Sequence, residues 1–123
     1  MQSSSVGTTV RVGNHTLTPE EQAAGVPDRE PFVDDTGAPV DPDTVALGLL
    51  APTGLRRTFG YPAAAPEDTG VLTREETGRF YVDWTPAGDE DGVWGWFLVG
   101  TMTGGASRSD QDVFYTKRPI VPT

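Results

Sequence analysis

The chain has 123 residues and no cysteine, and its 18 acidic and 9 basic residues give a formal net charge of −9. The length indicates one domain, and the acidity argues against binding nucleic acid or anionic lipid, both of which require a basic face. Without cysteine there is no disulfide or thiolate site, and 15 glycines and 11 prolines favour short strands joined by many turns.

The amino-terminal part predicts one short helix. Residues 1–7 are expected to be a flexible or docking tail, without the basic and apolar regions of a secretory signal. Thr18-Pro19-Glu20-Glu21 has the form of a capping box, in which the Thr18 side chain accepts from the amide of Glu21. We therefore expect a helix over about residues 19–24, inserted on a β framework and ended by the glycine that follows.

The rest of the chain predicts strands at sandwich-like spacing. They are expected over residues 8–12, 32–33, 44–50, 55–61, 70–74, 78–86, 92–100 and 112–116. Residues 118–123 are expected to be a tail, because prolines cannot continue a ladder. No run of about 18 apolar residues predicts a membrane span. The sequence thus predicts an all-β antiparallel sandwich of seven or eight strands over residues 8–117.

Two neighbouring strands carry all three tryptophans and predict the core. Phe80, Val82 and Trp84 share one face of the first strand, and Trp94, Trp96 and Leu98 share one face of the second. The expected core comprises Val45, Leu47, Leu49, Phe59, Phe80, Val82, Trp84, Trp94, Trp96, Leu98, Val113 and Tyr115. An exposed Trp84 or Trp94 would mean that this register is wrong.

An ordered set of segments resembles a known family. Residues 37–47, with Asp41-Pro42-Asp43, are followed by Pro52-Thr53-Gly54, by Gly78-Arg79-Phe80-Tyr81-Val82-Asp83-Trp84 and by Gly92-Val93-Trp94-Gly95-Trp96. This set is similar to the small immunoglobulin-like structural proteins of tailed bacteriophages, especially those of actinobacterial hosts. The resemblance implies an immunoglobulin-like sandwich and a virion component without catalysis. Residues 13–31 depart from the family pattern, which runs directly from the first strand to the Asp-Pro segment.

The candidate chemical residues do not form a recognisable reaction centre. His15 is the only histidine, so neither a typical zinc set nor a Ser-His-Asp arrangement is indicated, and we expect a histidine without a special role. The carboxylates at residues 34–35, 75–76 and 89–91 lie in predicted turns, where charge is normally solvated. Asp89-Glu90-Asp91 could bind Ca²⁺ but lacks the regular loop spacing. We expect a non-enzymatic protein with no catalytic residue, metal or cofactor.

The first functional expectation is a structural protein of a virion, assembled in the host cytoplasm, that joins subunits at the head–tail connector or tail. Its partners would be connector, tail or major capsid proteins, and further copies of itself in a symmetric homo-oligomer. Direct contact with nucleic acid or membrane is not expected. The candidate interface residues are Val10, Val12, Arg56, Arg57, Lys117 and Arg118.

Two alternatives remain open at this point. The first is a capsid decoration (cement) protein, which differs from a connector in its place on the particle and its copy number. The second, from another class, is a carbohydrate- or host-surface-binding module. That module requires an exposed aromatic patch, for which the region of Phe59 and Tyr61, or one tryptophan, is the candidate.

Overall fold

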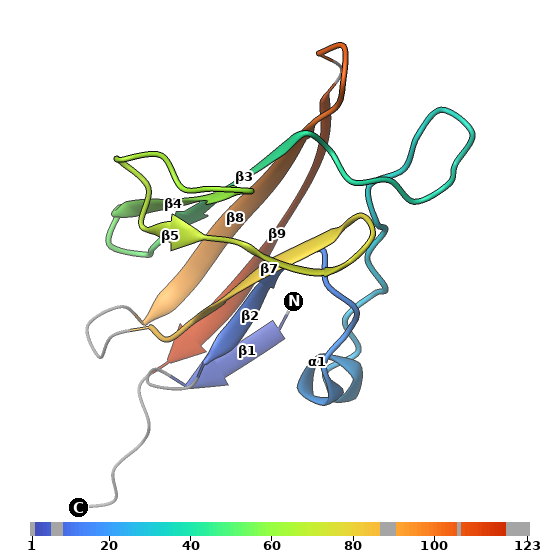
Figure 1. Cartoon of the computed structure of the whole chain (residues 1–123). Coiled ribbons are helices and arrows are strands. Elements are labelled where there is room, and N and C mark those ends of the chain that lie inside the picture. Colours follow the sequence, from blue (N-terminus) through green and yellow to red (C-terminus); the bar gives the residue numbers. More distant parts are fainter. Residues whose placement is uncertain (1, 6–8, 87–90, 106, 118–123) are drawn as a thin grey trace, which may run out of the picture.

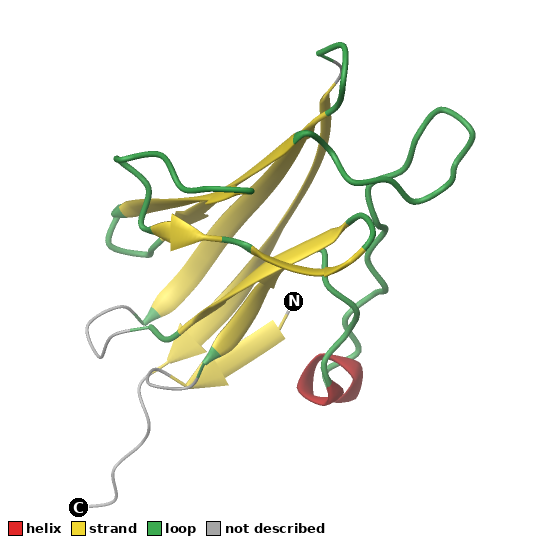
Figure 2. Cartoon of the chain, viewed as in Figure 1, coloured by secondary structure: helices red, strands yellow, loops and turns green. Residues whose placement is uncertain are grey.

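The protein is a two-sheet, mostly β structure with one short helix (Figure 2). The computed structural model describes residues 2–5, 9–86, 91–105 and 107–117, with the side chains described over 9–86, 91–105 and 107–114. A six-stranded sheet has the order β1-β9-β8-β3-β4-β5, and a three-stranded sheet has the order β2-β7-β6. The all-β class and the helical insertion predicted from the sequence are confirmed.

The described residues form nine strands and one helix (Figure 1). The elements are β1 Gln2–Ser5, β2 Val10–Gly13, α1 Pro19–Ala23, β3 Thr44–Leu50, β4 Arg56–Tyr61, β5 Gly70–Val71, β6 Thr73–Glu76, β7 Arg79–Trp84, β8 Gly92–Thr101 and β9 Ser107–Lys117. Within the described residues no helix is long and apolar enough to cross a bilayer. The predicted division into tails at 1–7 and 118–123 around a central domain remains a prediction, and β1 lies within the first of these segments.

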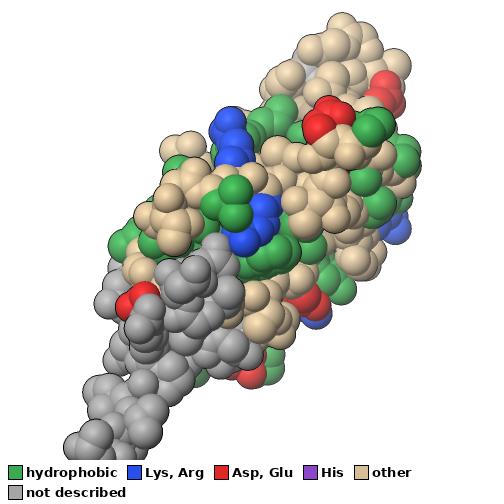
Figure 3. Space-filling model, turned by 90° about the vertical axis from the view of Figure 1, so that its left-hand side faces the viewer, with side chains coloured by type: hydrophobic (Ala, Val, Ile, Leu, Met, Phe, Trp, Pro, Cys, Tyr) green, Lys and Arg blue, Asp and Glu red, His purple; other side chains and the backbone are tan. Residues whose placement is uncertain are grey.

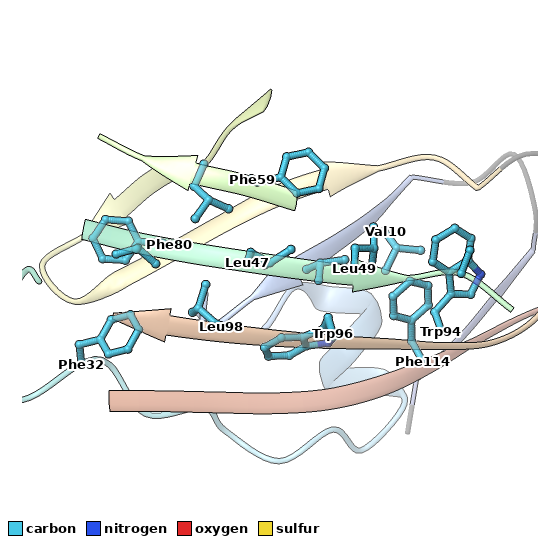
Figure 4. Close-up of a cluster of buried hydrophobic side chains, with 14 residues drawn as sticks. Val10, Phe32, Leu47, Leu49, Phe59, Phe80, Trp94, Trp96, Leu98 and Phe114 are labelled. Carbon is cyan, nitrogen blue, oxygen red and sulfur yellow. The ribbon is translucent and has the colours of Figure 1, made fainter. Parts of the chain in front are cut away.

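The centre of the large sheet is β8, which pairs antiparallel with β3 on one side and β9 on the other. Its residues alternate, so that Trp94, Trp96 and Leu98 are buried while Val93 is half exposed. Such alternation places every second side chain on the same face of a strand. Figure 4 shows the buried set of β8 beside Leu47 and Leu49 of β3, with Phe80 of β7 across the core. Both strands therefore point their large side chains at the three-stranded sheet.

Most of the predicted core is confirmed. The buried predicted residues are Val45, Leu47, Leu49, Phe59, Phe80, Trp94, Trp96 and Leu98. Val82 and Trp84 are partly buried and pack against this cluster. The structure adds several residues, namely Val10, Val12, Phe32, Ala51, Leu72 and Phe114.

One core prediction is wrong: Val113 is 41 % exposed, whereas its neighbour Phe114 is 3 % exposed. The register pairs Phe114 with Trp94, and the two rings stack with centroids 5.6 Å apart. The run Val113-Phe114-Tyr115 is apolar at every position, so its own pattern does not distinguish the two faces. The pairing with β8 decides the inner face. The side chain of Tyr115 lies outside the described residues.

The strand boundaries differ from the predicted ones by one or two residues at several ends, and by more in three places. The closing strand β9 begins at Ser107 and is longer than expected. The predicted strand at 70–74 is two strands in different sheets, β5 and β6, and the buried Leu72 lies between them. The predicted strand at 32–33 is reduced to a single bridge between Val33 and Pro39.

The helix forms as the capping box predicts. Thr18 is the N-cap and accepts from the amide of Glu21, while the Glu21 carboxylate accepts from the amide of Thr18. A glycine with φ of 75°, Gly25, follows the last turn. The chain then runs along one side of the molecule toward β3 (Figure 1). This insertion brings charged side chains from residues 14–31 against the end of the three-stranded sheet.

Candidate functional site

A buried polar cluster holds the helical insertion together. It consists of His15, Glu21 and Arg29, whose side chains are 0 %, 1 % and 10 % exposed. His15 Nε2 donates a hydrogen bond to Glu21 Oε1 over 2.6 Å. Arg29 Nη2 donates to Glu21 Oε2 over 2.5 Å. His15 is therefore a fully buried partner of a carboxylate, and the expectation that it has no chemical role stays a prediction.

Glu21 is ionised in this cluster. Burial raises the pKa of its carboxyl, but the hydrogen bonds from His15 and Arg29, with a further one from the Thr18 amide, outweigh burial and lower the pKa from 4.5 to about 2. His15 has no exposed surface, and its Nδ1 has no hydrogen-bond partner among the described residues. A substrate cannot reach either group without the insertion moving. The cluster has a structural role: it fixes α1, through Glu21, to the chain segments before and after the helix, and we call it the clamp.

Asn14 fixes the same insertion to β7. Its Nδ2 donates to the carbonyl oxygens of Gly78, over 2.9 Å, and Glu30, over 3.2 Å. Its Oδ1 accepts from the amide of Phe80 over 2.8 Å. Arg79 then donates to the carbonyl oxygens of Asn14 and Arg29. Because all of these buried groups are paired, the start of the insertion has one defined position on the sheet.

A groove of about 440 Å³ lies between the insertion and β9. One wall is the segment 27–33, and the other is the stretch of β9 from Arg108 to Asp112. Trp96 also lines the groove, although it is only 5 % exposed. Four acidic residues line the groove, namely Asp28, Glu30, Asp110 and Asp112, against the two basic residues Arg29 and Arg108. Both of these arginines already form ion pairs, with Glu21 and Asp35 respectively.

The second surface feature is the side of the large sheet that faces away from the core, here called the outer apolar face and defined by Leu50, Val93, Phe97 and Val113. The register places Leu50, Gly95 and Val113 in one row across three strands. Leu50, Val93 and Val113 are 49 %, 52 % and 41 % exposed.

The middle of the outer apolar face is open. A Cβ added at Gly95 would meet no atom within 4 Å. The Arg56 guanidinium lies 5.0 Å from the centroid of the Phe97 ring. On the side of the molecule shown in Figure 3, hydrophobic side chains likewise lie beside Lys or Arg side chains. The arrangement is one of apolar side chains on a continuous sheet surface with the Arg56 cation beside it, which suits contact with another protein.

Comparisons of the chain with protein-family models, curated proteins and solved structures return no significant match. The functional argument therefore depends on the geometry of these surfaces and on the sequence pattern.

Of the predicted interface residues that the structure describes, the two valines are buried and the two arginines are at least partly exposed. Val10 and Val12 are 2 % and 1 % exposed and lie in the core, because the β2 register places both opposite core-facing positions of β7. Their side chains cannot contact a partner, which leaves only the backbone edge of β2 for docking. Arg56 is exposed beside Phe97, and Arg57 lies over the ring of Trp84. Arg118 and the side chain of Lys117 lie outside the described residues.

The carboxylates predicted to be solvated mostly have structural partners. Asp34 accepts from the amides of Thr36 and Ala38 and from the Thr36 hydroxyl, and these bonds lower the pKa of its carboxyl. Glu75 accepts from the amide and hydroxyl of Thr16. Asp89 and Glu90 of the considered Ca²⁺ site lie outside the described residues. Among the residues that are described, no group of three or more ligating side chains is placed to hold a metal ion.

The aromatic patch required for a sugar-binding surface is not formed at Phe59 and Tyr61. Phe59 is 4 % exposed and packs edge-on against Trp84, and Tyr61 packs on Phe80 with ring centroids 4.8 Å apart. Trp94 and Trp96 are buried. Neither the groove nor the outer apolar face was identified from the sequence. The outer apolar face follows from the alternation of β8, whereas the groove depends on how the insertion folds back.

Proposed function

We propose that the chain is a non-enzymatic structural protein of a tailed-phage virion, with an immunoglobulin-like fold, that joins subunits at the head–tail connector or tail. The proposal combines the segments that resemble such proteins with two properties of the structure. These are the order of its strands and the exposed apolar surface of its larger sheet.

The strand order supports an immunoglobulin-like fold of the variable type. In that type, with the strands counted along the chain, the third, fourth and fifth strands lie in one sheet together with the last two strands. The remaining strands form the other sheet. Here β9-β8-β3-β4-β5 and β2-β7-β6 follow the same chain order. Three features depart from it. The first strand, β1, pairs with β9 in the larger sheet, and β5 runs parallel to β4. The third departure is the insertion between β2 and β3.

The outer apolar face is the observation that carries the proposal. Leu50 and Val93 lie on the two central strands of a six-stranded sheet, Val113 lies on the neighbouring strand β9, and all three side chains are about half exposed. Burying an apolar side chain of this size stabilises a complex by roughly 1 to 2 kcal/mol relative to leaving it in water. Repeated around a ring of subunits, such a surface supplies the association that a connector or tail component needs. The acidic remainder of the chain keeps the free subunits soluble.

The test is mass spectrometry on purified phage particles from the host that encodes this chain, with copies counted against the major capsid protein. About six or twelve copies per particle, on symmetry grounds, would support a connector or tail position. Hundreds of copies would replace that position with capsid decoration or a tail lattice. Absence from intact particles would overturn the virion proposal.

A further inference from the structure

Part of the long edge strand β9 has no neighbour on its outer side. β9 pairs with β8 from Ser107 to Thr116. On its other side β1 pairs only with residues 114–117. Within the described residues, the stretch 107–113 is therefore a free strand edge, roughly 20 Å long at the rise of a β-strand. An unpaired edge of this length is a template for another strand.

The amides of this edge are occupied by neighbouring side chains. The amide of Gln111 donates to the carboxylate of Asp110, and the amide of Val113 donates to that of Asp112, over 2.8 Å in both cases. Alternate residues of an antiparallel strand direct their backbone groups to opposite sides. Both amides therefore point away from β8, toward the free side. The two carboxylates therefore accept hydrogen bonds from the same backbone amides that an added strand would use.

The side chains of the same two aspartates lie on the inner face of the sheet, the face that carries the core residues of β8. Asp110 pairs with Leu98 and Asp112 pairs with Trp96, and both partners are buried. Charged side chains pointing inward are one way in which an edge strand avoids unspecific pairing. Here they line the 440 Å³ groove, opposite Asp28 and Glu30 of the segment 27–33. The free edge thus forms one wall of a groove, and the acidic side chains of the groove come from both of its walls.

A buried donor, with no acceptor within the described part of the chain, lies in the wall of the groove. Arg29 lines the groove and is nine-tenths buried, and its Nη2 is taken by Glu21. Its Nε has no hydrogen-bond partner among the residues that the structure describes. Pro27, Pro31 and Phe32 supply apolar surface on the same wall. This apolar surface suits an extended segment with alternating side chains better than a small ion.

We propose that this groove binds an extended, basic peptide segment of a partner protein, which adds as a strand to the free edge of β9 next to β1. The carbonyl oxygens of the segment would take the amides of Gln111 and Val113. The carboxylates of Asp110 and Asp112, once released, would pair with Lys or Arg side chains of the segment. Because the two aspartates are two residues apart, the segment should carry basic residues at alternate positions. This site is independent of the outer apolar face and of the virion proposal.

A second copy of the chain does not fit this site. The edge itself presents Asp110 and Asp112, so a second copy paired here would bring its own aspartates against them. Like charges placed directly opposite across a strand pair are destabilising. A basic segment instead gains four acidic neighbours. Charge complementarity therefore selects a partner of the opposite sign.

The probe is a fluorescein-labelled seven-residue peptide in which lysine alternates with valine, titrated with the full-length protein and followed by fluorescence polarisation. Two matched peptides serve as controls, one with glutamate in place of lysine and one with proline at the central valine. The matched variants are D110N/D112N and E20Q/E67Q. Both variants remove two negative charges, but Glu20 and Glu67 are exposed and do not line the groove.

We expect saturable binding of the lysine peptide that weakens as salt is raised from about 50 to 300 mM. Affinity should fall at least about tenfold for D110N/D112N and less than about twofold for E20Q/E67Q. The glutamate and proline peptides should bind at least about tenfold more weakly, the second because proline has no amide for the ladder. No binding at millimolar protein, or equal affinity for both variants, would overturn the proposal. Self-association of the chain alone that D110N/D112N changes would identify a second copy as the occupant and would equally overturn it.

Discussion

Replacing the buried carboxylate in E21Q tests the clamp on the helical insertion. The Glu21 side chain is 1 % exposed, and the hydrogen bonds of His15 and Arg29 lower its pKa to about 2, against 4.5 in an ordinary glutamate. One pKa unit corresponds to about 1.4 kcal/mol, so ionised Glu21 contributes about 3 kcal/mol to the free energy of unfolding at neutral pH. Removing one partner of a buried ion pair has a similar cost. E21Q should therefore be about 3 kcal/mol less stable than the wild type at pH 7.

The pH dependence of this difference follows from the lowered pKa. A carboxyl with a depressed pKa stabilises the folded state above the pKa of the unfolded state, and this contribution is lost as the pH falls toward the folded value. The difference between wild type and E21Q should stay near about 3 kcal/mol at pH 5. It should be about 2 kcal/mol at pH 3.5 and under about 1 kcal/mol at pH 2.5. Other carboxyls titrate in both proteins and cancel in the comparison.

The assay is urea denaturation followed by tryptophan fluorescence, with the free energy of unfolding obtained by linear extrapolation at each pH. E20Q is the control, since Glu20 is in the same helical turn but exposed, and it should change stability by less than about 0.5 kcal/mol. A difference between E21Q and wild type that is the same at pH 7 and pH 2.5 would refute the electrostatic reasoning. So would an E21Q protein as stable as the wild type.

Three further predictions concern the core, the backbone and the outer apolar face. F114A should lower the free energy of unfolding by about 3 to 4 kcal/mol and V113A by less than about 1, since only Phe114 is buried; equal losses in urea denaturation would contradict the register of β9. G13A should cost at least about 2 kcal/mol, because a Cβ there would lie 2.2 Å from the Phe80 carbonyl oxygen at a φ of 142°. G105A, with a φ of 93° and open space, should cost about 1; the two melting temperatures should separate in that order. V93K should weaken any self-association seen by analytical ultracentrifugation, whereas T73K on the other sheet should not; equal effects would remove the outer apolar face as the contact.

The sequence predicts those elements whose pattern is local. The capping box at Thr18, the alternation of β8 and the burial of Trp94 and Trp96 all follow from short-range rules, and the structure bears them out. The face of β9 could not be predicted in this way, because Val113-Phe114-Tyr115 is apolar throughout and its inner side is chosen by pairing with β8.

The polar cluster and the groove were beyond prediction for a different reason. His15 follows a strand, Glu21 lies inside the short helix α1 and Arg29 follows that helix. No spacing rule relates three residues in such different settings. One signal was present in the sequence. A capping-box glutamate followed by an arginine in a chain with few basic residues indicates a candidate buried pair, although it does not indicate that the histidine completes it.

The parallel pairing of β1 with β9 has a mechanical consequence. Gln2 lies opposite Phe114 and Ser5 lies opposite Lys117, so the two strands nearest the chain ends run side by side in the same direction. A force applied at the amino-terminal end of β1 and at the carboxyl-terminal end of β9 would pull the two strands in opposite directions, parallel to their length. The hydrogen bonds of a parallel pair lie across that pull and share the load, instead of opening one after another. The pairing of β1 with β9 therefore loads its hydrogen bonds together when the two strands are pulled in opposite directions.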